Sequence, residues 1–134
     1  MNANPMSDQF YAAAAAARRI VAAHAFPDSP VVVRPRGWVD EVSDDFMAAY
    51  RADPRGCLHL QSPQPVFGTL QEMGIVRCVG CYTLHALAGV RPPCDRCGGD
   101  SSDVCQGSVT VGPVVIVVSM CDACRAVTNA EQQG

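Results

Sequence analysis

The sequence repeats one short pattern three times: Cys78-Val-Gly-Cys81, Cys94-Asp-Arg-Cys97 and Cys121-Asp-Ala-Cys124. Two thiolates separated by two residues can point from one tight turn at the same ion, and two such turns complete a tetrahedral shell of four sulfurs. Zinc prefers that shell. The six cysteines are therefore predicted to be metal ligands, and the predicted cofactor is Zn²⁺, as one ion or two.

Six paired thiols exceed the four ligands of one tetrahedral site, so the pairing of the three motifs stays open. The first pair could share an ion with the second, across 12 residues, or with the third, which would leave the middle pair over. A second ion would need two further ligands, and the candidates are Cys57, His59, His85 and Cys105. Taken singly, these two cysteines are more typical of small buried apolar residues, and the two histidines of ordinary structural roles.

The segments around the thiol pairs predict short strands and helices. Residues 75–77 favour a strand that runs into Cys78, and residues 82–88 favour a helix that stops at a glycine. Residues 109–111 and 114–118 are rich in valine and predict two strands on either side of a Gly-Pro turn. Residues 125–133 predict a final helix.

The middle pair, with its Pro-Pro start and Gly-Gly end, is typical of a zinc knuckle. A knuckle, a hairpin and a Cys-x-x-Cys pair at the first turn of a helix resemble the treble-clef and zinc-ribbon fold groups, over residues 94–134. The resemblance implies that one Zn²⁺ is held by Cys94, Cys97, Cys121 and Cys124. These fold groups host many unrelated functions, so the resemblance implies no particular activity.

The chain before the motifs predicts helices and one strand. Alanine-rich residues 9–25 favour a helix whose small side chains dock on the rest of the protein, and residues 44–52 favour a second helix capped by Ser43. Proline-rich residues 28–35 favour an extended edge segment, and Trp38 is predicted to be buried in a small local core. Residues 57–60 alternate as in a strand, with the cysteine and the histidine on one face.

The predicted fold class is α+β: a small zinc-stabilised module of a β-hairpin and short helices, with an N-terminal helical arm. Residues 1–56 are predicted to form that arm with its proline-rich linker, and residues 57–134 the cysteine-rich zinc-binding domain. A chain of 134 residues can bury only a modest core, and only 6% of this one is aromatic. A bound metal that joins distant turns would stabilise such a core.

The sequence also indicates the cellular compartment and the kind of genome that encodes the chain. We expect a cytoplasmic protein without a membrane segment, because the alanine-rich start lacks the features of a signal peptide and the longest apolar run is too short to span a bilayer. In that compartment clustered cysteines are more often metal ligands than disulfides. All ten basic residues are arginine, which suggests a GC-rich genome such as that of an actinobacterium or one of its phages.

No enzyme is predicted. Catalytic zinc keeps a position open for water, whereas the sulfur-rich candidates here could close the shell, and no motif indicates a small-molecule substrate. The predicted function is a structural-zinc protein that acts as a protein–protein interaction or accessory module. One alternative is a nucleic-acid-binding zinc-ribbon regulator, because Arg77, Arg91, Arg96 and Arg125 lie near thiol pairs, although the net charge of −3 argues against it. A second alternative is a redox-sensing thiol and zinc protein.

Overall fold

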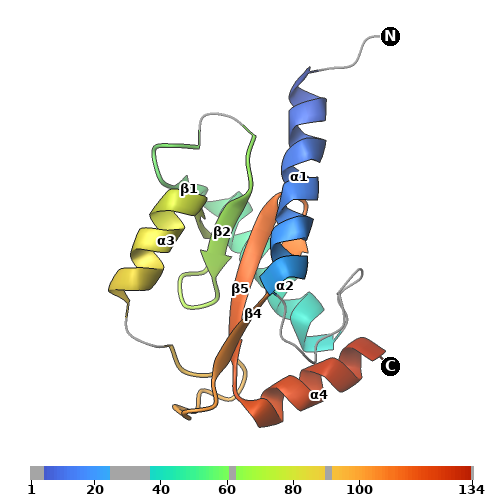
Figure 1. Ribbon diagram of the computed structural model, residues 1–134, viewed down its shortest axis with the longest axis vertical. Coiled ribbons are helices and arrows are strands. Elements are labelled where there is room, and N and C mark those ends of the chain that lie inside the picture. The colour runs from blue at the N-terminus through green and yellow to red at the C-terminus, as the bar shows by residue number, and fades with distance from the viewer. Residues whose placement is uncertain (1–4, 25–36, 61–62, 90–91, 134) are drawn as a thin grey trace.

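The structure, a computed structural model, describes residues 5–24, 37–60, 63–89 and 92–133 (Figure 1). The protein is small and α+β, as predicted, and these residues form four helices and a five-stranded mixed sheet. The elements are α1 (Pro5–His24), α2 (Gly37–Ala52), β1 (Arg55–Gly56), β2 (Val66–Thr69), β3 (Ile75–Cys78), α3 (Val79–Ala88), β4 (Cys105–Val111), β5 (Val114–Met120) and α4 (Asp122–Gln133).

The sheet has the strand order β1-β3-β2-β5-β4. The predicted hairpin is confirmed: β4 and β5 pair antiparallel, with Cys105 opposite Met120 and Val111 opposite Val114. Two pairings are parallel, β1 with β3 and β2 with β5. The β2–β5 pairing joins segments that lie far apart in the sequence, and it makes one sheet of the hairpin and the upstream strands.

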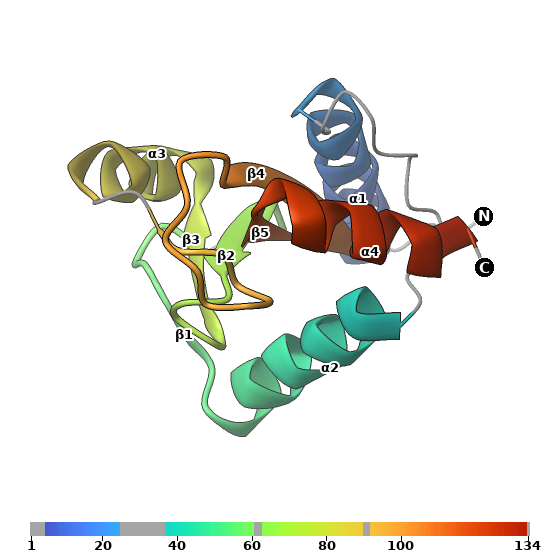
Figure 2. The same ribbon diagram turned by 90° about the horizontal axis from the view of Figure 1, so that it is seen from below.

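β5 passes through the middle of the structure, and all seven of its residues are buried. Its side chains alternate between two apolar clusters, as a strand buried on both faces requires. Ile116 and Val118 pack with residues of α2, whereas Val115 and Val117 pack with residues of α1 and α3. Figure 2 shows α2 on one side of the sheet and α1 and α3 on the other.

α2 begins at Gly37 rather than near residue 44, so the predicted cap Ser43 lies inside the helix and is buried. In this longer helix Val39, Ser43 and Phe46 follow the helical period and are buried. Phe46 is completely buried, and its ring lies over β2. A Cβ atom added at Gly68 would come within 2.2 Å of that ring, so the close approach requires glycine there.

α1 docks on β4 and β5 through its alanines, as predicted. Ala13, Ala14 and Ala17 are buried, and their small side chains let the helix approach the sheet closely. The predicted edge segment at residues 28–35 lies outside the described residues. The division of the chain at residue 56 stays a prediction.

The predicted strand at residues 57–60 is wrong. The pairing with β3 ends at Gly56, after which Cys57–Leu60 form a turn. The turn carries the chain back over the end of β3, where the Cys57 Sγ accepts a hydrogen bond from the backbone N–H of Cys78 at 3.3 Å. In the described part of the chain, no helix combines the length and apolar character needed to cross a bilayer.

Candidate metal centres

The structure gathers metal-ligand side chains at two places. One group, the four-cysteine set, is Cys94, Cys97, Cys121 and Cys124; the other, the cysteine–histidine set, is Cys57, His59, Cys78 and Cys81. In each set, one ligand atom from every residue lies within 4.8 Å of the other three. Four sulfurs, or three sulfurs and an imidazole nitrogen, are donor sets typical of structural zinc, so each set could hold a metal ion.

The four-cysteine set lies between the knuckle at residues 94–99 and the first turn of α4. The knuckle is closed by backbone hydrogen bonds from Cys94 to Gly99 and from Gly98 to Cys94, each of 2.9 Å. Gly98 has a φ of +77°, which favours glycine, and the backbone N–H of Gly99 donates to the Cys97 Sγ at 3.4 Å. The two turns meet where Cys97 and Cys121 approach to 3.9 Å between sulfurs.

Asp95 fastens the knuckle to the sheet. Its backbone N–H donates to the carbonyl of Ser119 at 2.7 Å, and its carboxylate accepts the backbone N–H of Ser119 at 2.6 Å. The same carboxylate accepts a hydrogen bond from Gln71, in the turn between β2 and β3. Burial raises the pKa of Asp95, while these two hydrogen bonds act in the opposite direction. The knuckle is thus held on β5 from outside the metal set.

Arg96, between the two knuckle cysteines, joins three elements. Its guanidinium donates to both carboxylate oxygens of Glu131 in α4, at 2.7 and 2.8 Å, and to the Thr128 hydroxyl at 2.8 Å. It also lies over the ring of Trp38 in α2, 5.3 Å from the ring centroid. The bidentate pair with Arg96 lowers the pKa of Glu131. The four-cysteine set is therefore linked to α2 as well as to α4.

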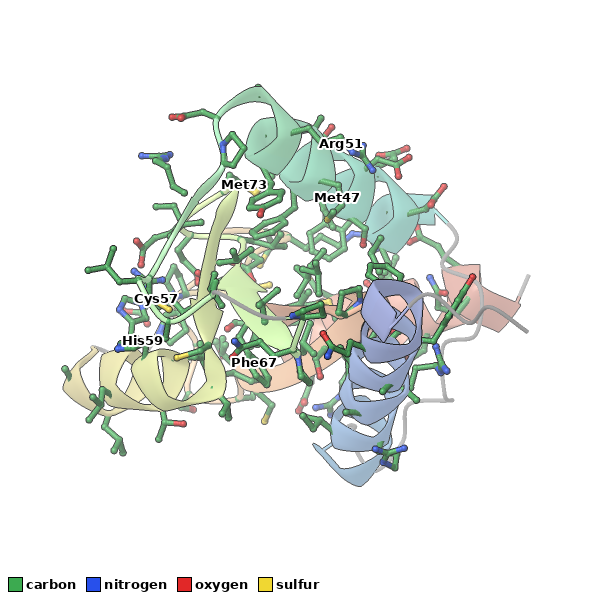
Figure 3. The ribbon with its side chains drawn as sticks, turned by 90° about the horizontal axis from the view of Figure 1, so that it is seen from above. Met47, Arg51, Cys57, His59, Phe67 and Met73 are labelled. Carbon is green, nitrogen blue, oxygen red and sulfur yellow. The ribbon has the colours of Figure 1, made fainter. Side chains whose placement is uncertain are left out.

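The cysteine–histidine set forms where a turn meets the start of a helix. Cys78 is the last residue of β3 and the N-cap of α3, and its sulfur accepts the backbone N–H of Cys81 at 3.4 Å. The Nδ1 of His59 lies 3.2 Å from the sulfur of Cys81 and 3.9 Å from that of Cys78. Cys57 and His59 stand side by side near α3 in Figure 3. The short β1–β3 pairing brings this turn to the helix.

Within the cysteine–histidine set, the pKa values of two thiols are shifted in opposite directions. The backbone N–H of Cys78 lowers the pKa of Cys57 to about 6, because a donor to the sulfur stabilises the thiolate. The hydrogen bond with the Cys78 side chain raises the pKa of Cys81 to about 11, because it keeps the proton on that sulfur. A divalent cation would displace this proton.

The four-cysteine set likewise contains one thiol with a lowered pKa and one with a raised pKa. Burial raises the pKa of Cys94, but the backbone N–H groups of Cys97, Cys121 and Arg96 together outweigh it and bring the pKa down to about 6. Burial, followed by hydrogen bonds with the neighbouring sulfurs, raises the pKa of Cys124 to about 12. Both sets thus combine a readily ionised thiol with one that holds a proton until a cation replaces it.

The structure distinguishes between the pairings of the three thiol pairs that the sequence left open. It brings the second and third thiol pairs together, as the resemblance implied, and places the first pair with neither of them. Cys57 and His59, two of the four residues named as candidate ligands of a second ion, join the first pair. The signal for them was their spacing in Cys57-Leu-His59, which the sequence interpretation used only to place both on one face of a strand.

The other two candidates lie outside both sets. The Nε2 of His85 lies 2.9 Å from the carboxylate of Glu72, which also accepts from Arg77. Cys105 is an exposed residue at the start of β4. Comparison of the chain with protein-family models, curated proteins and solved structures found no match in any of the three.

Proposed function

We propose that each set holds one structural Zn²⁺ and that the chain is a non-enzymatic zinc protein that acts through contact with other proteins. The observation that carries the proposal is the pair of four-ligand sets, each assembled from segments apart in the sequence. Two sequence-distant segments brought to one ion are cross-linked by it, so its binding free energy becomes folding free energy. A structural role for both ions follows from this argument.

The donor sets favour structural over catalytic ions. A catalytic zinc normally has three protein ligands and a water molecule, whereas each set here offers four side chains. Among the described residues, no carboxylate belongs to either set. Glu72, the acid closest in sequence to Cys78, is engaged by Arg77 at 3.1 Å and by His85 at 2.9 Å.

Charge pairing favours a protein partner over nucleic acid. Three of the four arginines near the thiol pairs have an acidic partner within 3.1 Å: Arg77 with Glu72, Arg96 with Glu131 and Arg125 with Asp122. Paired arginines contribute little to the electrostatic attraction on which phosphate binding depends. By contrast, apolar side chains are exposed beside the cysteine–histidine set, as a protein contact would require. The nucleic-acid and redox-sensing alternatives stay predictions.

Native mass spectrometry with elemental analysis tests the metal. We expect two zinc ions per chain, and a chelator should remove the ion of the cysteine–histidine set first because none of its ligands is buried. Cys57→Ser should reduce the count to one, whereas Cys105→Ser, the matched change at a cysteine outside both sets, should leave two. A chain that stays folded with no metal and with all eight thiols free would contradict the proposal.

A further inference from the structure

α3 has no buried residue, unlike the other helices in the described part of the chain. Its inner side is engaged: Tyr82 stacks on Phe67 of β2 at 5.2 Å between ring centroids, and His85 bonds to Glu72. Its outer side carries Leu84 and Leu87, whose exposed fractions are 70% and 79%. An apolar helix of this kind is normally covered, so this surface is unusual for an isolated chain.

The outer residues form one stripe. Gly80, Thr83, Leu84 and Leu87 follow the spacing i, i+3, i+4, i+7, which places them along one face of a helix. That spacing is typical of a face that packs against another element. Leu58, in the turn that carries His59, is also exposed, with an exposed fraction of 88%.

A hollow of about 650 Å³ lies along the stripe, between it and the cysteine–histidine set. Val79, Gly80, Thr83 and Leu84 line one part of it, and His59 and Cys78 line the metal side. A Cβ atom at Gly80 would meet no atom within 4 Å, so the space above that residue is open. The surface therefore offers both a projecting part, the leucines, and an open recess beside them.

Charge indicates what covers this surface. Residues 79–89 contain no Asp, Glu, Lys or Arg, although charged residues make up 17% of the chain. In a twofold symmetric pair, each side chain near the axis faces its own copy, so any charge there would meet its like. A stripe without charge avoids that repulsion and, with its leucines beside a recess, is complementary to itself.

We propose that a second copy of this chain covers α3, with the two α3 helices antiparallel and the leucines of each copy entering the recess of the other. The twofold axis passes near Thr83 and Leu84, the middle of the stripe. This inference rests on the proposed function, because an ion on Cys78 and Cys81 fixes the start of the helix that forms the interface. A ten-residue helix is only about 15 Å long. We therefore expect a weak dimer, with a dissociation constant on the order of 1–100 μM.

Sedimentation equilibrium of the zinc-loaded full chain, from low to high micromolar concentration, tests the dimer. Leu84→Glu should raise the dissociation constant by more than roughly 100-fold, because two like charges would have to leave water at the axis. The matched control is Val127→Glu on α4, which also places an acid at an exposed apolar helix position, with an exposed fraction of 51%, and should leave dimerisation unchanged. A wild-type chain that stays monomeric throughout, or equal loss in both variants, would overturn the inference.

A mixing experiment identifies the second copy and guards against a variant that fails to fold. Leu84→Glu and Leu84→Lys chains should each stay monomeric, and an equimolar mixture should form a mixed dimer as opposite charges meet across the axis. Failure of the mixture to associate, where the wild-type chain does, would refute the placement of α3 against α3. Native mass spectrometry counts chains and ions separately. A monomer with two ions would contradict only the proposed dimer, whereas a folded chain without ions would contradict the proposed function.

Discussion

The two candidate metal sets have the same number of ligands but different surroundings. In the four-cysteine set, Cys94 is only 1% exposed and belongs with Cys121 to the main apolar core. In the cysteine–histidine set no residue is buried and His59 is exposed. An ion in the first set would be part of the core, whereas an ion in the second would fasten an exposed helix to the turn that follows a two-residue strand. The same chemistry can therefore support a whole fold or a single element.

The largest expected effect is that of Cys94→Ser. We expect it to lower the free energy of unfolding by more than about 4 kcal/mol, because it removes a ligand and places an unpaired hydroxyl in the core. Denaturant unfolding followed by circular dichroism measures the loss. Cys105→Ser, at an exposed cysteine outside both sets, should change the stability by less than about 0.5 kcal/mol. Comparable losses of stability in the two variants would contradict the view that the four-cysteine set supports the core.

A smaller and more local effect is expected for His59→Ala. The affinity for one of the two ions should fall by more than the roughly 10–100-fold that loss of an outer-shell contact costs. Hydrogen exchange should speed up in α3 and in residues 55–60, while β5 keeps its protection, since only the exposed end of the sheet is released. His85→Ala removes the other histidine of this region and should leave both ions bound. If exchange in β5 rises as much as in α3, the two sets are not independent.

The smallest expected effect is that of Glu131→Gln, which tests the link between the four-cysteine set and α2. The variant loses the charge of the bidentate contact with Arg96 and should lower the melting temperature by about 2–5 °C. The fluorescence of Trp38, the only tryptophan, should change with it, because Arg96 lies over that ring. Asp53→Asn, at the more exposed pair with Arg55, is the control and should change neither signal.

The same variant gives a pH test. The pKa of Glu131 is lower in the fold than in the unfolded chain, so its contribution is fully present above the unfolded value. As the pH falls below the ordinary range of a glutamate and through the lowered pKa, the carboxylate takes up a proton and the contribution is lost. The stability difference between wild type and Glu131→Gln should therefore be constant near neutral pH and shrink in acid. A difference that grows in acid would show that the carboxylate is not held ionised by Arg96.

The sequence predicted the region around the four-cysteine set well, because its signals are local. Two residues between thiols, a valine-rich hairpin about Gly112-Pro113 and a helix after Cys121 each act over a few positions, and each is present in the structure. The α+β class followed from them. The set itself was one of several pairings that the spacing allowed, and the architectural resemblance selected it.

The cysteine–histidine set could be recognised only in part, because it depends on pairing between distant segments. β1 is two residues long, too short for a periodic pattern, and it pairs in parallel with a strand about 20 residues later. The alternation of Cys57 and His59 suggested a strand, whereas a turn is needed to aim both side chains at Cys78 and Cys81. Helix α2 was predicted too short for a related reason: its first turns are stabilised by Glu131 and Arg96, which come far later in the chain.

The position of the two sets along the chain has a consequence for synthesis on the ribosome. All four ligands of the cysteine–histidine set lie within residues 57–81, whereas the four-cysteine set is complete only when residue 124 has been added. At about 5–20 residues per second, translation takes roughly 2–9 seconds to cover that interval. An ion could therefore bind the cysteine–histidine set before β5 has paired with β2, whereas an ion could bind the four-cysteine set only after residue 124 has been added.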